Sequence, residues 1–182
     1  VWCSGERRCL ALPWRGRHKG CILTPPLIVQ TLGFTREKFV TLEWKYAEDS
    51  VDWNELSALY RAAPLGEKKP MHLQKVFSNS LFKCFVYEDS KLVAAGRALA
   101  DGADCSYICD IAVTPSHQGS GLGQQVVAHL VEVSRGHKKI ILYAVPGKEF
   151  FYRKFGFLRM KTAMALFENQ LQQVERGYLS DV

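Results

Sequence analysis

Residues 117–126 read HQGSGLGQQV, with glycine at positions 119, 121 and 123, and they run directly into an apolar segment of helical character. Each glycine in regular structure destabilises by roughly 0.5–1 kcal/mol relative to alanine. Three glycines at the start of a helix therefore indicate that bare backbone is needed there. Free N–H groups at a helix N-terminus, together with the helix dipole, favour a negatively charged guest. The stretch predicts a phosphate-binding loop, in which amides approach an anion without a Cβ in the way.

Two common nucleotide-binding signatures do not fit this spacing. A Walker loop needs Gly-Lys-Ser/Thr, but Gly123 is followed by Gln124. The dinucleotide fingerprint GxGxxG, started at Gly119 and Gly121, places its third glycine at Gln124 as well. The sequence therefore indicates a phosphate-bearing ligand that neither signature describes.

The composition is that of an ordinary folded domain, with 182 residues of which 47% are hydrophobic and 23% are charged. The longest apolar segment, residues 22–34, is interrupted by Pro25 and Pro26 and is too short for a membrane helix, so we expect no membrane partner. Residues 1–34 hold five basic residues and one acidic residue, which leaves only +2 of the net charge of +6 for the remaining chain. A nearly neutral folded part argues against nucleic-acid binding.

Residues 1–34 are interpreted as a leader, a transit-like segment or an added extension, and residues 35–182 as the folded domain. Three cysteines, Cys3, Cys9 and Cys21, lie in the first segment with a spacing too irregular for a zinc site, and no metal is expected. No CxxC pair occurs, and the other three cysteines lie in or beside apolar stretches. Reduced thiols are expected, in the cytoplasm or in the lumen of a reducing organelle.

The pattern from residue 38 onward predicts alternating elements. Asp52 is the expected N-cap of the first helix, with Glu55 as its capping-box partner, and Asp89–Ser90 is the expected hairpin turn. The strands are predicted at 39–47, 81–89, 91–101, 106–115, 139–145 and 160–167, and the helices at 52–63, 70–79, 126–136, 148–155 and, frayed, 168–182. This order predicts an α+β fold on a mixed sheet.

The glycine stretch resembles the acetyl-CoA-binding motif of the GNAT superfamily of N-acetyltransferases. Residues 118–123, QGSGLG, match the pattern (Gln/Arg)-x-x-Gly-x-(Gly/Ala) between a predicted strand and a predicted helix. About thirty residues downstream, Tyr152 followed by Gly156-Phe157 resembles the family's Tyr-x-x-x-Gly-Phe signature. The likeness extends from Phe39 to Phe167 and implies a mostly antiparallel central sheet flanked by helices. The segment ICDIAV followed by HQGSGLG is locally similar to glucosamine-phosphate N-acetyltransferases.

The resemblance implies that acetyl-CoA is the co-substrate and that two backbone segments hold it. The strand at Ile111, Ala112 and Val113 would pair with the pantetheine arm. Tyr152 would protonate or hydrogen-bond the departing thiolate. The loop amides that would hold the diphosphate belong to Gln118, Gly119, Ser120, Gly121, Leu122, Gly123 and Gln124.

Further candidates follow from charge and position. Asp110 interrupts an apolar strand, where a charge is costly unless it is used or paired, so it is a candidate for catalysis or amine binding, against a structural ion pair. Lys148, Arg153 and Lys154 are candidates for the phosphates of the CoA. Many family members carry an asparagine before the tyrosine helix, where this chain has Val145-Pro146-Gly147.

The predicted reaction is transfer of an acetyl group to a primary amine by direct attack in a ternary complex. A small-molecule amine is favoured: an amino sugar, a polyamine, an arylalkylamine or an amino acid. The alternatives are acetylation of protein lysines or N-termini, or a non-catalytic acyl-CoA sensor. The resemblance also allows a homodimer through the strands from Lys161 onward.

Overall fold

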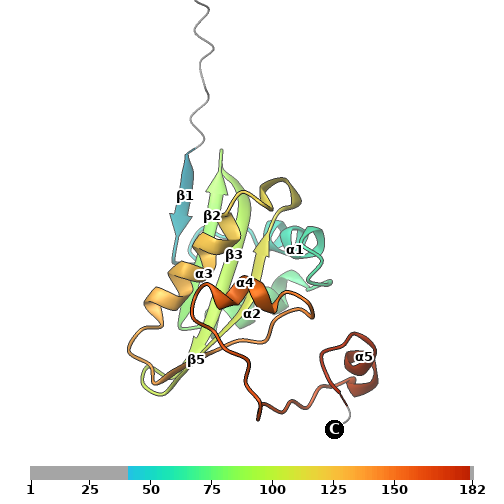
Figure 1. Ribbon diagram of the computed structural model, residues 1–182. Coiled ribbons are helices and arrows are strands. Elements are labelled where there is room, and N and C mark those ends of the chain that lie inside the picture. The colour runs from blue at the N-terminus through green and yellow to red at the C-terminus, as the bar shows by residue number, and fades with distance from the viewer. Residues whose placement is uncertain (1–40, 181–182) are drawn as a thin grey trace, which may run out of the picture. The chain divides into compact units, whose positions relative to one another are not determined.

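The computed structural model describes residues 41–180, in which five strands and the helices between them form one α+β unit (Figure 1). The class predicted from the sequence is confirmed. The elements in chain order are β1 (Leu42–Lys45), α1 (Trp53–Ala62), α2 (Pro70–Ser78), β2 (Phe82–Glu88), β3 (Lys91–Ala100), β4 (Cys105–Val113), the 3-10 helix η1 (Pro115–His117), α3 (Leu122–Val133), β5 (Lys139–Ile141), α4 (Glu149–Arg153) and α5 (Gln170–Glu175).

Some predictions lie outside the described residues. These are the segment 1–34 with its three cysteines and the first two residues of the predicted first strand, Phe39 and Val40. Within the described part, no helix is long and apolar enough to cross a membrane.

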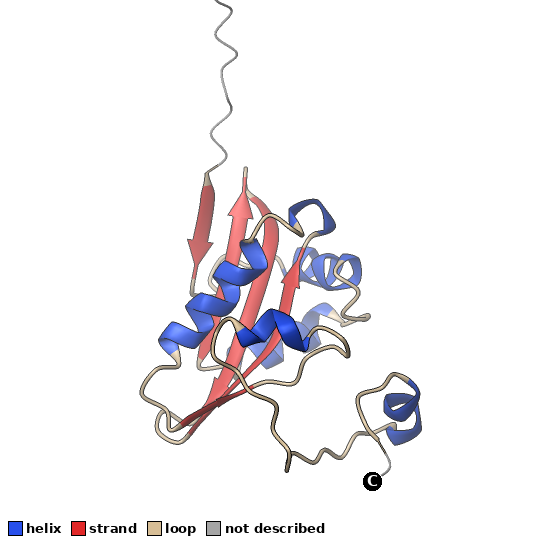
Figure 2. Cartoon of the chain, viewed as in Figure 1, coloured by secondary structure: helices blue, strands red, loops and turns tan. Residues whose placement is uncertain are grey.

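The sheet is mixed, with the strand order β1-β2-β3-β4-β5 (Figure 2). The first three pairs are antiparallel, and only β4 and β5 run parallel. That parallel pair is short, because it joins only Cys105–Tyr107 of β4 to Lys139–Ile141 of β5. The rest of β4 therefore has a strand neighbour on one side only.

Helices cover both faces of the sheet, and the alternation of side chains along β2 shows how. Phe85 and Tyr87 pack into a core with α1 and α2. Cys84 and Val86 point the other way, into a core with α3. Because side chains alternate across a strand, a run of consecutive apolar residues such as this one fills two cores at once.

A β-bulge in β4 sets the direction of the side chain of Asp110. Arg97 of β3 is opposite Cys109, and Ala95 is opposite Ala112, so β4 carries one residue more than β3 between these pairs. Asp110 lies there with φ of 53°, in the left-handed region. The bulge shifts the alternation by one residue, so that Ile108 before it and Ile111 after it both face the α3 core. Without the bulge, the side chain of Asp110 would face that core as well; with it, the side chain lies on the other face of the sheet.

Several local predictions are confirmed. Asp52 Oδ1 accepts hydrogen bonds from the N–H groups of Asn54 (2.8 Å) and Glu55 (3.4 Å), as an N-cap does. The turn at Asp89–Ser90 joins β2 to β3 with positive φ at both residues. The capping-box role of Glu55 is wrong, because its carboxylate instead accepts the N–H of Leu92 of β3 at 2.8 Å.

The C-terminal strands were over-predicted. The strand expected at 139–145 ends at Ile141, and Tyr143 is 60% exposed beyond it. No strand forms at 160–167 within the described chain, and Met164 and Leu166 are exposed. A β-strand exists only where a neighbour takes up its hydrogen bonds, and neither segment has one. The helix after the glycines begins at Leu122, four residues before the predicted start.

The helix α3 packs closely against β3 at Gly96. A Cβ at this position would lie 2.8 Å from Val126 Cγ1 and 3.0 Å from Leu130 Cδ1 of α3. We predict that Gly96→Ala lowers the free energy of unfolding by about 1–3 kcal/mol, because the overpacked helix must shift. Chemical denaturation measures this loss. Ala100→Ser at the half-buried end of the same strand is the control. Equal stability of the two variants would contradict the close packing of α3 against Gly96.

Candidate functional site

The glycine loop leads from η1 into α3 and requires two of its glycines for their backbone conformation. Gly119 and Gly121 have φ of 81° and 91°, and Gly121 is the N-cap of α3. Residues with a Cβ pay roughly 1–2 kcal/mol to adopt this region. The space where each Cβ would stand is open, with no atom within 4 Å.

The amides of this loop are the central feature of the site. The N–H groups of Gly119, Gly121 and Gly123 donate to no acceptor within residues 41–180. Neighbouring amides are used: Ser120 N donates to His117 O, and Gln124 N donates to Gly121 O. Three free amides at alternate positions, at the positive end of a twelve-residue helix, are the arrangement that favours an anion and make the loop the candidate site.

The other loop residues hold the loop in place. Ser120 Oγ donates to His117 O at 2.6 Å and accepts the N–H of Leu122. The side chain of Leu122 is buried in the core under α3. The side chain of Gln118 donates to the carbonyl oxygen of Val113 at 3.0 Å, which ties the loop to the end of β4.

The second part of the site is the free edge of β4 at residues 111–113. Thr114 N donates to Val93 O of β3. Because successive backbone amides point to opposite sides of a strand, those of Val113 and Ile111 point away from β3. On that side β5 has already ended, since its pairing stops at Tyr107. An extended ligand can therefore take the position of a missing strand.

The helix α4 brings Tyr152 to the same region. A Cβ on Gly123 would lie 3.9 Å from Phe151 Cζ and 3.4 Å from Val113 Cγ2, so α4 packs against the glycine loop. Tyr152 follows Phe151 and packs edge-on to its ring. Burial, reinforced by nearby Tyr178, raises the pKa of Tyr152. Its hydroxyl therefore stays protonated at neutral pH and can act as a donor.

The three basic candidates lie on the surface around α4. Arg153 stacks over Phe150, and the ammonium of Lys154 lies 4.7 Å from the centre of the Phe151 ring. Lys148 is exposed at the N-terminus of α4. None of the three has an acidic partner within the described chain, so each remains available to an anionic ligand.

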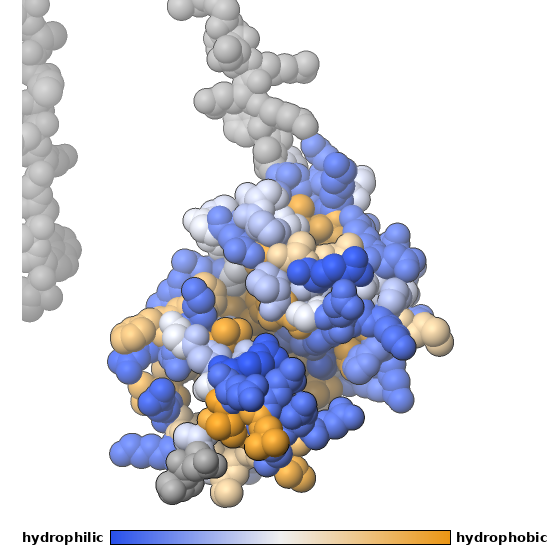
Figure 3. Space-filling model, turned by 90° about the vertical axis from the view of Figure 1, so that its right-hand side faces the viewer, coloured by the Kyte–Doolittle hydropathy of each residue, from blue (hydrophilic) through white to orange (hydrophobic). Residues whose placement is uncertain are grey.

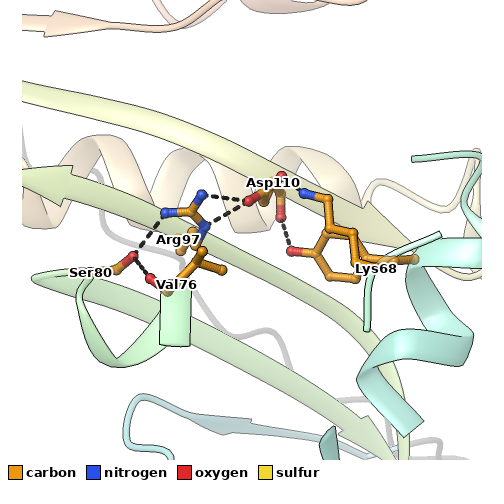
Figure 4. Close-up of polar contacts among 6 residues, drawn as sticks. Lys68, Val76, Ser80, Arg97 and Asp110 are labelled. Atoms are coloured by element: carbon orange, nitrogen blue, oxygen red, sulfur yellow. Dashed lines mark hydrogen bonds and ion pairs between the residues drawn. The ribbon is translucent and has the colours of Figure 1, made fainter. Parts of the chain in front are cut away.

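Asp110 is the centre of a separate network on the α1 and α2 side of the sheet (Figure 4). Its Oδ1 accepts a hydrogen bond from Lys68 Nζ. Its Oδ2 accepts from Arg97 Nε at 2.7 Å and lies 2.6 Å from Arg97 Nη2. Its backbone carbonyl, left free by the bulge, accepts from the hydroxyl of Tyr60 at 2.7 Å. Arg97 Nη1 also donates to Ser80 Oγ at 3.1 Å.

These cations decide the protonation state of Asp110. Burial by itself raises the pKa of its carboxyl, but the hydrogen bonds and charges of Lys68 and Arg97 outweigh burial and hold the pKa below its ordinary value. A carboxylate in this state is a weak proton acceptor at neutral pH. The arrangement fits the attraction and orientation of a cation better than the removal of its proton.

Sequence reasoning missed the partners of Asp110. Lys68 is 42 residues away in the chain and Arg97 is 13 residues away. One signal was available, because Arg97 is a charge inside the apolar strand KLVAAGRALA just as Asp110 is inside its own. Two opposite charges inside neighbouring strands favour an ion pair across them.

Cys109 lies beside this network, but its thiol is not a nucleophile at neutral pH. Burial, opposed only in part by the charge of Arg97, raises the pKa of its thiol to about 11. Since the thiolate is the reactive form of cysteine, the group stays inert at neutral pH. Cys84, Cys105 and Cys109 are all free thiols.

Comparison with known proteins identifies the class that this fold and site define. The model of the "Acetyltransferase (GNAT) family" matches residues 43–157, which is more than half of the chain. The chain therefore belongs to the GNAT family and, by class, to the acyltransferases.

Curated relatives agree with this assignment over parts of their length. An uncharacterised N-acetyltransferase of Prochlorococcus marinus is 26% identical over 59% of this chain and 63% of its own. Serotonin N-acetyltransferase 2, chloroplastic, of Oryza sativa is 45% identical over 36% of this chain and 34% of its own. Glucosamine 6-phosphate N-acetyltransferase 1 of Oryza sativa is 33% identical over 42% and 52%. The chain thus spans between about a third and two thirds of these relatives.

Solved structures share the fold. A GNAT-family acetyltransferase of Streptococcus pneumoniae superimposes with a TM-score of 0.60 at 21% identity, over 72% of this chain and 98% of that one. Glucosamine-6-phosphate N-acetyltransferase of Arabidopsis thaliana does so with a TM-score of 0.55 at 18% identity, over 71% and 99%.

The lowered pKa of Asp110 predicts a specific dependence of stability on pH. A carboxyl with a depressed folded-state pKa stabilises the protein above its unfolded-state pKa, and this contribution is lost as pH falls through the folded-state value. We predict that Asp110→Asn costs about 3 kcal/mol at pH 7, because Lys68 and Arg97, whose side chains are 26% and 11% exposed, lose their partner. The difference from the wild type should shrink below about pH 4.

Urea denaturation between pH 7 and pH 3 measures this prediction. Asp49→Asn, at an exposed position ahead of α1, is the control and should follow the wild type. A difference that is constant with pH would show that the charge of Asp110 is not what stabilises the network.

Proposed function

We propose that the chain is an acetyl-CoA-dependent N-acetyltransferase that acts on the primary amine of a small molecule. One observation carries the proposal: the three free amides of the glycine loop lie beside the free edge of β4. A ligand with a diphosphate at one end and an extended, amide-containing arm at the other satisfies both. CoA has this constitution, and its thioester supplies the acetyl group.

The residues of the chain would then divide the work between binding and proton transfer. The amides of Gly119, Gly121 and Gly123 hold the diphosphate. The helix α4 packs beside Gly123, and its basic residues bind the remaining phosphate charge. These are Lys148, Arg153 and Lys154. The amides of Ile111 and Val113 hold the pantetheine arm and help to polarise the acetyl carbonyl.

Acetyl transfer forms a C–N bond and breaks the C–S bond. An acceptor bound as an ammonium ion loses one proton before it can attack and a second as the amide forms, and the thiolate gains one. Tyr152, which is protonated at neutral pH, donates to the sulfur. The carboxylate of Asp110 attracts and orients the acceptor. Water takes both protons from the nitrogen, because the pKa of Asp110 is too low for that task. Direct attack is favoured over a covalent acyl-enzyme, since the thiol of Cys109 stays protonated.

The acceptor is proposed to be a small molecule because a hollow of suitable size lies next to Asp110. Arg97, which binds Asp110, also lines a hollow of about 580 Å³ between α2 and β3. Sites for small molecules commonly measure roughly 300–1,000 Å³. If no small amine is consumed, two alternatives remain. The chain then acetylates a lysine or an N-terminus of a protein, or it binds acyl-CoA without turnover.

We propose a reducing organelle as the location, with the cytoplasm as the alternative. Two relatives, of Oryza sativa and Arabidopsis thaliana, are named as chloroplastic. The free thiols of Cys84, Cys105 and Cys109 are consistent with a reducing compartment.

A homodimer is proposed through the segment 158–166. Leu158, Met160, Met164 and Leu166 are all more than half exposed. Figure 3 shows that hydrophobic side chains reach the surface on the lower part of the molecule. In the described chain β5 is the last strand of the sheet, so its outer edge has no strand neighbour. A second copy that supplies segment 158–166 would cover both the edge and the apolar side chains.

The proposed role of Tyr152 predicts a change in turnover without a change in binding. Tyr152→Phe removes the proton donor and keeps the ring, so we expect kcat to fall roughly 10²-fold. The affinity for CoA in calorimetry should stay the same. Thiol release from acetyl-CoA over a panel of amines measures the first quantity, and Tyr46→Phe at an exposed position just after β1 is the control. Full activity of the Tyr152 variant would contradict the role, and failure of the wild type to bind CoA would contradict the proposed function.

The dimer predicts a change in mass in solution. Light scattering on the full chain should give twice the mass of 20.6 kDa. Replacing two exposed side chains, Met164→Lys with Leu166→Lys, should produce the monomer because charges are costly in an apolar interface. Met71→Lys, at an exposed position of α2, is the control that should remain dimeric. A wild-type monomer at all concentrations would contradict the proposal.

A further inference from the structure

The hollow next to Asp110 is built from two elements that do not take part in the glycine loop. Its apolar lining comes from Met71 and Val76 of α2 and from Leu99 of β3. Its polar lining is His72, Lys75, Asn79 and Arg97. An apolar floor with a few polar groups is the usual composition of a small-molecule site.

Arg97 connects this hollow to the network of Asp110. Its Nε and Nη2 face Asp110 Oδ2, while the residue also forms part of the lining of the hollow. Figure 4 shows the guanidinium between Asp110 on one side and Ser80 on the other. A molecule in the hollow therefore lies beside the residue that holds the carboxylate of Asp110.

The electrostatic balance of this region is positive. Lys68 and Arg97 both pair with the carboxylate of Asp110, and Lys75 and Arg97 line the hollow. No acidic residue lines the hollow among the described residues. Lys75 forms no ion pair within residues 41–180 and is exposed at the end of α2. Its charge is available to a ligand.

We propose that the acceptor is an amine that carries a second, anionic group, a carboxylate or a phosphate, and that Lys75 selects it. This inference rests on the proposed function and specifies its substrate class. The anionic group lies against Lys75 and Arg97, and the carbon skeleton lies over Met71, Val76 and Leu99. A polyamine is disfavoured, since it would bring further positive charge to three cations.

The network of Asp110 gives the orientation of such an acceptor. Asp110 Oδ1 already accepts the ammonium of Lys68, so this oxygen accommodates an alkylammonium group. The amine of the acceptor takes the same side of Asp110, and Lys68 moves aside on its loop between α1 and α2. The amine and the anionic group are thus held at opposite ends, on either side of Arg97.

Paired amines that differ by one anionic group test the proposal. The probes are glucosamine 6-phosphate against glucosamine, 5-aminopentanoate against pentylamine, and spermidine as the polycation. Calorimetry on the full chain gives each dissociation constant, and acetyl-CoA turnover gives kcat/KM. For at least one pair, the member with the anionic group should bind about tenfold more tightly than the member without it, an advantage that rising salt weakens. The pair with the larger difference identifies the anionic group.

Lys75→Glu should abolish this advantage through KM, with kcat nearly unchanged. Lys91→Glu, which makes the same change of charge at the exposed first residue of β3, is the matched control and should keep it. The proposal is overturned if spermidine or the amines without an anionic group bind as tightly as those that carry one, if none of the probes binds, or if the advantage survives Lys75→Glu. If acetyl-CoA is neither bound nor consumed, the proposed function fails, while the paired dissociation constants still decide the chemistry of the hollow.

Discussion

The separation of β4 from β5 after Tyr107 is the constraint on which the rest of the site depends. Two parallel strands pair over three residues each and then part, so the second half of β4 keeps one edge of unpaired amides. Backbone N–H groups away from water require a partner, and an extended ligand supplies one. The same half-strand leads directly into η1 and the glycine loop. The two binding features of the site are therefore consecutive in the chain and rigidly joined, with Gln118 tied back to Val113.

The bulge at Asp110 places a charged side chain on the face of the sheet that α1 and α2 cover. One additional residue turns a side chain that would have met the α3 core toward α1, α2 and the cations of Lys68 and Arg97. The ligand edge and the charged network thus belong to one strand, a few residues apart. In the proposed function the acyl donor lies along the edge of the sheet and the acceptor over its face. Arg97 joins the two regions, because it pairs with Asp110 and also lines the hollow.

Local signals predicted the fold class and the place of the glycine loop before a helix, and long-range pairing decided what they missed. Gly119 and Gly121 are needed for positive φ, and Tyr152 lies on a short helix that packs beside Gly123, all within reach of sequence patterns. The partners of Asp110 were not predictable in the same way, since no periodicity connects Lys68 to a residue 42 positions away. Segment 160–167 has the composition of a strand but finds no neighbour in the described chain, and composition alone cannot supply one. The separate role of Glu55, which holds Leu92 of β3, is a tertiary contact that overrides a local capping pattern.

The most direct test of the central claim is to follow the backbone amides themselves. In a titration of the isotopically labelled chain by nuclear magnetic resonance, CoA should shift the amide signals of Gly119, Gly121 and Gly123 strongly. Pantetheine, which lacks the diphosphate, should leave those three signals in place and shift only Ile111 and Val113. Glycine amides that do not respond to CoA, or that respond equally to pantetheine, would contradict the account that these bare amides hold a diphosphate.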